Sequence, residues 1–147
     1  MSGSLDHSPD QILRELLINL GGGTDPDDSG SWPIYAVREP ETPDNVITIT
    51  GTTGYLKARV MSGYVYEHPG AQIRIRAYDQ SAAYVKANAL AVLIDAIALK
   101  TVTLDSSTYV VFNVKRTGPI LNVGKEVPQS KRHVYTINVV VNLRQTS

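Results

Sequence analysis

The chain has 147 residues, of which 42% are hydrophobic and 19% charged; its formal net charge is zero and it contains no cysteine. This composition predicts one globular domain over residues 1–147, with a flexible tail at 1–7, and it excludes disulfides, thiolate nucleophiles and thiolate zinc sites. The longest apolar stretch, 87–99, is too short and too polar to span a bilayer, and the first residues lack a secretory signal, so we expect an intracellular protein without a membrane partner.

The first predicted element is a helix from Ser8 to about Leu20. Ser8 is a favourable N-cap, Pro9 suits the first helical position, and Gln11 closes a capping box. Three glycines end the helix, and the acidic, turn-rich segment 21–31 is expected to be a mobile loop. The apolar residues recur every three or four positions and predict one buried face: Ile12, Leu13, Leu16, Leu17 and Leu20.

Short extended segments follow near Ile34–Arg38 and Val46–Thr50. Two prolines within 39–43 deny backbone donors to a sheet, so this connection is expected to be irregular or at an edge. Between Tyr55 and Tyr66 the pattern is ambiguous, although alternate residues could share one side of a strand. Pro69-Gly70 predicts a turn.

Residues Ala71–Ala77 alternate strictly, with apolar side chains on one side and Gln72, Arg74 and Arg76 on the other, as in a half-buried strand. An alanine-rich helix follows, with Asp79 or Ser81 as its cap. Because its buried residues are small, this helix can approach a sheet closely. Its predicted stripe consists of Ala83, Ala87, Leu90, Ile94 and Ile97.

Two more strands are predicted, Tyr109–Arg116 and Arg132–Arg144, joined by a loop at Gly124–Lys131. The first is expected to place Val110, Phe112 and Val114 on one face. The second alternates between an apolar side and a polar side. The order helix, strands, helix, strands predicts an α+β fold with two layers: a mostly antiparallel mixed sheet with two helices packed on one face. The regular strand–helix alternation of a doubly wound nucleotide-binding fold is missing.

No residue pattern indicates an enzyme, and no catalytic residue is predicted. His7, His68 and His133 are far apart in the chain, and none pairs with an acid at metal-ligand spacing. Asp6-His7-Ser8 holds the residue types of a serine triad, but a triad needs side chains that converge from separate segments.

A calcium loop is also not favoured. Asp25, Asp27, Ser29 and Gly30 match positions one, three, five and six of such a loop, yet Ala36 stands where the bidentate carboxylate should be. We therefore predict no metal and no cofactor.

The charges are unevenly divided along the chain. Residues 1–50 carry nine acids and two bases, whereas residues 51–147 carry five acids and twelve bases. Two solvated faces of different sign would explain this, and so would a head-to-tail contact between copies. The candidate interface residues are Arg74, Arg76, Tyr78, Lys115, Arg116, Asp25, Asp27 and Asp28.

A nucleic-acid-binding module is the alternative from another class. The four basic candidates could meet phosphates, but no base-stacking aromatics are interleaved with them, and the sequence pI of about 6.8 is far below that of typical nucleic-acid-binding domains. Ion pairs within the protein or at an interface are therefore favoured.

Several segments together carry a family resemblance. These are residues 69–77 (PGAQIRIRA), the helix segment 84–87 (YVKA), and the late segments 116–120 (RTGPI) and 134–138 (VYTIN). In their order and character they resemble the tail terminator proteins of long-tailed bacteriophages, also labelled minor capsid or minor tail proteins. The resemblance extends from about Pro9 to Arg144.

The resemblance implies a structural virion protein that forms a hexameric ring, caps the finished tail tube, stops its polymerisation and joins the tail to head-completion proteins. The partners implied are other copies of the chain, the tail tube protein and the head-completion or connector proteins, with DNA passing through the ring without sequence-specific binding. The expected location is the head–tail junction of the virion, assembled in the host cytoplasm. A head–tail connector or tail-completion protein is the chief rival within this class.

Overall fold

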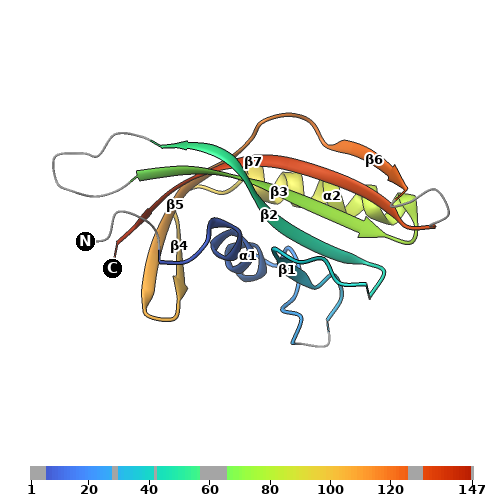
Figure 1. Cartoon of the computed structure of the whole chain (residues 1–147), viewed down its shortest axis with the longest axis horizontal. Coiled ribbons are helices and arrows are strands. Elements are labelled where there is room, and N and C mark those ends of the chain that lie inside the picture. Colours follow the sequence, from blue (N-terminus) through green and yellow to red (C-terminus); the bar gives the residue numbers. More distant parts are fainter. Residues whose placement is uncertain (1–5, 28–29, 42, 57–65, 126–130, 147) are drawn as a thin grey trace.

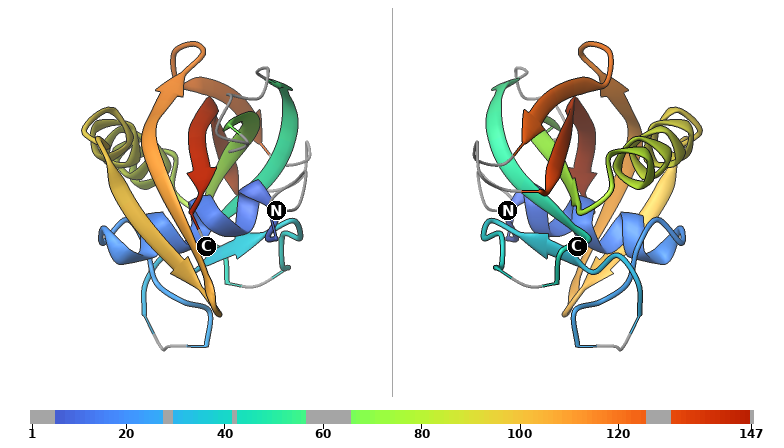
Figure 2. Two further views of the ribbon diagram at one scale, coloured as in Figure 1. Left: turned by 90° about the vertical axis from the view of Figure 1, so that its left-hand side faces the viewer. Right: turned by 90° about the vertical axis from the view of Figure 1, so that its right-hand side faces the viewer.

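The computed structural model describes residues 6–27, 30–41, 43–56, 66–125 and 131–146. Within them the order of elements is α1 (Pro9–Asn19), β1 (Ile34–Ala36), β2 (Val46–Leu56), β3 (Tyr66–Ala77), α2 (Gln80–Asp95), β4 (Lys100–Leu104), β5 (Ser107–Arg116), β6 (Leu121–Lys125) and β7 (His133–Gln145). The strands form one mixed sheet in the order β1-β2-β3-β7-β5-β4, and β6 pairs with the same edge of β7 as β5. The sheet curls into a half-barrel around the helices (Figures 1 and 2), which confirms the predicted α+β fold.

The helix α1 begins and ends where the sequence predicts, but the prediction of a capping box is wrong. Ser8 occupies the N-cap position with an extended backbone, and its side chain makes no capping hydrogen bond. Pro9 occupies the first helical position, where its fixed φ suits the helix and its missing N–H leaves no donor unsatisfied. At the other end Gly21 adopts φ +83°, a left-handed conformation that glycine reaches without strain.

The core lies between the concave face of the sheet and the two helices. Pairing brings Ile49, Ile73 and Ile137 into one row across β2, β3 and β7, and all three are fully buried. The opposite faces of these strands carry the polar residues, as the alternation predicts. In α2 the small side chains of the predicted stripe are buried, and Asp79 occupies the N-cap position but makes no side-chain capping hydrogen bond.

The turn predicted at Pro69-Gly70 is wrong, because both residues lie inside β3. Gly70 pairs with Thr52 on one side and with Val140 on the other. The register between β2 and β3 shifts next to Pro69, between Thr52 and Tyr55. Proline, which lacks an N–H donor, is therefore placed where the ladder is already interrupted.

The face predicted for the strand at Tyr109–Arg116 is also wrong. Val111 is fully buried and Val114 is nearly so, whereas Val110 and Phe112 are only half-buried. The register of β5 against β7 shifts between Val111 and Asn113. This bulge moves the alternation by one residue, so a strict period of two assigns the wrong side chains to the core.

Two strands were not predicted. β4 forms a hairpin with β5, and β6 includes the first residues of the loop predicted at Gly124–Lys131; residues 126–130 lie outside the described residues. Of the ambiguous stretch between Tyr55 and Tyr66, residues 57–65 also lie outside them, and its ends belong to β2 and β3. No helix of the described chain is long and apolar enough to cross a membrane.

Candidate functional site

The described residues of 38–45, here called the strap, are held against β3 by Arg76. Its guanidinium lies 3.7 Å from the Glu39 carboxylate, and only 1% of the residue is exposed. It donates hydrogen bonds to three strap carbonyl oxygens, at 3.2, 2.6 and 3.2 Å: those of Glu41, Pro43 and Asp44. Arg76 therefore holds the strap in place from its buried side, and in this subunit its guanidinium is covered and cannot contact another molecule.

Arg74 points to the same side of β3 but reaches solvent. Its Nε donates to Glu39 Oε1 at 3.0 Å, and 32% of its side chain is exposed. The two arginines thus share Glu39, and only Arg74 can contact a partner directly. Tyr78, just beyond β3, is 53% exposed, and its backbone N–H donates to Asn45 Oδ1 at 3.3 Å.

The outer edge of the strap is acidic. The side chains of Glu41 and Asp44 are 87% and 56% exposed, and both lie near Arg132, at 3.3 and 3.6 Å from its guanidinium nitrogens. Arg132 is itself only 15% exposed and also donates a hydrogen bond to the Glu41 carbonyl oxygen at 2.7 Å, so the two exposed carboxylates lie beside a largely buried cation. No side-chain pattern indicates this role of the strap, because the groups that accept the hydrogen bonds of Arg76 are backbone carbonyls.

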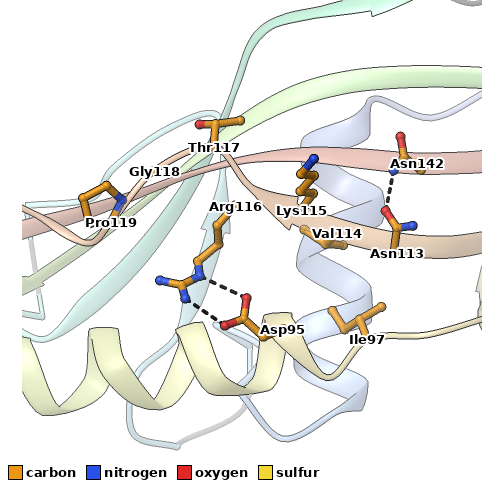
Figure 3. A pocket seen from close by; sticks show the side chains of 10 residues that line it. All are labelled: Asp95, Ile97, Asn113, Val114, Lys115, Arg116, Thr117, Gly118, Pro119 and Asn142. Carbon is orange, nitrogen blue, oxygen red and sulfur yellow. Dashed lines mark hydrogen bonds and ion pairs between the residues drawn. The ribbon is translucent and has the colours of Figure 1, made fainter.

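A second surface is an open groove of about 990 Å³ at the end of β5. Arg116 pairs with Asp95 at the end of α2 through two hydrogen bonds of 3.0 and 2.8 Å. Figure 3 shows Lys115 pointing away from this pair, as the alternation of a strand requires. The groove is lined by Asp95, Ile97, Asn113, Val114, Lys115, Arg116, Thr117, Gly118, Pro119 and Asn142.

The acidic loop after α1 supplies a third surface. Asp25 lies 3.4 Å from the Arg14 guanidinium and accepts a hydrogen bond from the Asp27 backbone N–H at 3.0 Å. The side chain of Asp27 is exposed. Asp28 lies outside the described residues. Within those residues no group of three potential ligands could hold a metal ion.

The structure separates the candidate residues into these three places. The acidic loop lies at one edge of the molecule, and the turn after Lys115 and Arg116 lies at the opposite edge in both views (Figures 1 and 2). The strap lies on the same half of the molecule as the loop. The acidic loop and the turn after Arg116 are thus at opposite ends of the subunit, whereas bases from the second part of the sequence pair with the acids of the strap: Arg74, Arg76 and Arg132.

The chain was compared with known proteins. A family model described as bacteriophage tail terminator protein matches residues 16–143, which includes the last turn of α1, all of α2 and every strand up to most of β7. Among curated protein sequences no significant match is found.

Proposed function

We propose that this chain, which belongs to the bacteriophage tail terminator family, forms a ring of identical subunits that caps the tail tube. Membership of the family makes the chain a structural, non-enzymatic component of the phage tail, associated with the virion and its tube. The ring, of six subunits in this proposal, stops tube polymerisation and presents a surface to head-completion proteins at the head–tail junction.

The family match carries the proposal, and the placement of charge supports it. A closed ring of identical subunits requires two different patches on each subunit that fit each other. The acidic loop that contains Asp25 and Asp27 lies at one edge of this subunit, and the turn after β5, which ends with Lys115 and Arg116, lies at the other. Opposite signs at opposite edges favour head-to-tail joining and disfavour association in the reverse orientation.

Arg74 is assigned to the contact with the tube or with a neighbouring subunit, whereas Arg76 contributes by holding the strap. Replacement of Arg74 would weaken such a contact directly, because a third of its side chain is accessible. Arg116 is engaged by Asp95, so its contribution requires the carboxylate to be shared or displaced.

Arrest of tube growth tests the proposal. Purified protein added to polymerising tail tube subunits is expected to bind tube ends and to stop elongation, as measured by tube length in electron micrographs. Tubes that elongate as they do without the protein would contradict the proposal. Binding to the portal or connector side but not to the tube would favour a connector instead.

A further inference from the structure

One edge of β5 is uncovered where the strand runs along the open groove. The ladder between β4 and β5 ends with the pair Lys100–Val111, and the last backbone bond on that side runs from the Leu99 N–H to the Phe112 carbonyl oxygen, at 3.0 Å. The pairing of β5 with β7 continues as far as Arg116. Beyond Phe112, β5 therefore has a neighbouring strand on one side and, within the described residues, none on the other.

The register shows which backbone groups face the uncovered side. Thr117 and Asn138 continue the register of β5 with β7, and the Thr117 N–H donates to the Asn138 carbonyl oxygen at 2.9 Å. In an antiparallel ladder, residues directed at the partner strand alternate with residues directed away from it. Lys115 is therefore directed at β7, whereas the N–H and C=O groups of Val114 and Arg116 are directed at the groove. The described part of the chain offers these groups no hydrogen-bond partner.

The groove gives room for a short extended peptide along this edge. Its volume is about 990 Å³, and its lining includes Val114 and Arg116 together with the apolar side chains of Ile97 and Pro119. Figure 3 shows Arg116 reaching toward Asp95 on α2. The two side chains of this pair are 30% and 50% exposed, so the pair contributes little stability and an occupant can displace it.

The side chains along this edge favour particular residues in the peptide. Lys115 is exposed, points away from the Arg116–Asp95 pair, and forms no salt bridge within the described residues. In a strand docked on β5, the residue opposite Lys115 lies on the same face, so a carboxylate there forms a cross-strand pair of opposite charge. A residue opposite Val114 lies on the other face, toward α2 and Ile97, where an apolar side chain fits. The edge therefore favours a strand that alternates apolar and acidic residues.

Another copy of this chain offers no such strand among its described residues. The outer strands β4 (KTVTL) and β6 (LNVGK) carry lysine and no acid. The outer side of β1 is occupied, because the Ile34 N–H donates to the Thr24 carbonyl oxygen and the Ile34 carbonyl accepts a hydrogen bond from Arg14. The acids of the strap and of the acidic loop lie outside the strands, in segments that contain proline. The occupant must therefore be a different protein.

We infer that the uncovered edge of β5 binds an extended segment of a partner protein in which an acidic residue stands between apolar residues. The segment adds a strand beside β5, in line with β4, and its backbone pairs with Val114 and Arg116. Lys115 selects the acidic residue, and the α2 side of the groove selects its apolar neighbours. The inference goes beyond the proposed ring and does not depend on it.

The first test measures amide hydrogen exchange in the free protein by NMR. The amides of Lys115 and Thr117 are expected to exchange slowly, because β7 accepts their hydrogen bonds, and those of Val114 and Arg116 about tenfold faster or more. Equal protection of all these amides at every protein concentration would overturn the inference, because the edge would then be covered within the subunit. Protection of Val114 and Arg116 that rises with protein concentration would also overturn it, because a second copy would then occupy the edge.

The second test adds capped synthetic peptides and follows the same amides. The peptide TVDVT is expected to bind with a Kd on the order of 1 mM or below and to slow exchange at Val114 and Arg116. TVKVT should bind a few-fold more weakly, and Lys115→Glu should reverse this preference. Lys125→Glu on β6, where the lysine is also exposed, is the matched control and should leave the preference unchanged. TPDPT, which lacks the backbone donors beside the acid, should not bind, and binding equal to that of TVDVT would overturn the inference.

The third test removes one backbone donor from the edge. Arg116→Pro deletes the N–H that is directed at the groove and leaves the bonds to β7 in place, whereas Arg116→Ala removes the side chain alone. Circular dichroism verifies that both variants fold. TVDVT is expected to bind the alanine variant and to bind the proline variant about tenfold more weakly or not at all. Equal binding to both variants, or no binding to the wild type, overturns the inference and leaves the proposed ring intact.

Discussion

Replacement of Arg76 by methionine is expected to destabilise the protein strongly. Methionine preserves much of the apolar stem but removes the donors to three strap carbonyls and the charge 3.7 Å from Glu39. Loss of one partner from a buried charged network costs about 3–5 kcal/mol. The lower end applies here, because Glu39 keeps its 3.0 Å contact with Arg74 and because the strap residues that lose their hydrogen bonds are exposed, so water can replace the guanidinium.

We therefore expect a loss of about 3 kcal/mol in the free energy of unfolding, equivalent to roughly 10 °C in Tm. Urea unfolding followed by circular dichroism measures it, and limited proteolysis reports release of the strap. Arg74→Met is the matched control, because its single pair with Glu39 is partly exposed and contributes less than about 1 kcal/mol. Equal and small effects of the two substitutions would refute the reasoning.

Two further predictions concern stability. Gly23→Ala is expected to cost about 1–3 kcal/mol in thermal unfolding, because its β-carbon would lie 2.5 Å from Ile34 Cγ1 and 2.6 Å from the Trp32 carbonyl oxygen. Gly51→Ala, which meets no described atom within 4 Å, should be close to neutral; equal losses would contradict this. Burial raises the pKa of Tyr109 above its ordinary value of 10.0. The neutral phenol therefore contributes its full stabilisation below pH 10.0, and this stabilisation is lost as the pH rises through the pKa of the folded state. Unfolding measured across this alkaline range should show less pH dependence in Tyr109→Phe, and an unchanged profile would exclude the phenol as the cause.

Elements with a long, regular pattern could be predicted from the sequence. The alternation of Ala71–Ala77 and the apolar spacing of α1 each require one buried face, and the structure buries that face. The α+β fold follows from the order of such elements. The bulge at Phe112 and the in-strand position of Pro69 could not be predicted in this way, because both depend on the register of neighbouring strands.

The candidate site was predictable in its residue types but not in its contacts. Arg74 and Arg76 share one side of a strand, as predicted, yet one reaches solvent and the other is covered by the strap. That difference arises from backbone carbonyls far along the chain, which no side-chain pattern reveals.

The mass of the purified protein in solution, measured by native mass spectrometry alone and mixed with tail tube subunits, tests the central claim most directly. The account predicts a closed assembly of identical subunits, of the order of a hexamer, that binds tube subunits. A protein that stays monomeric at every concentration and binds no tube subunit would contradict it.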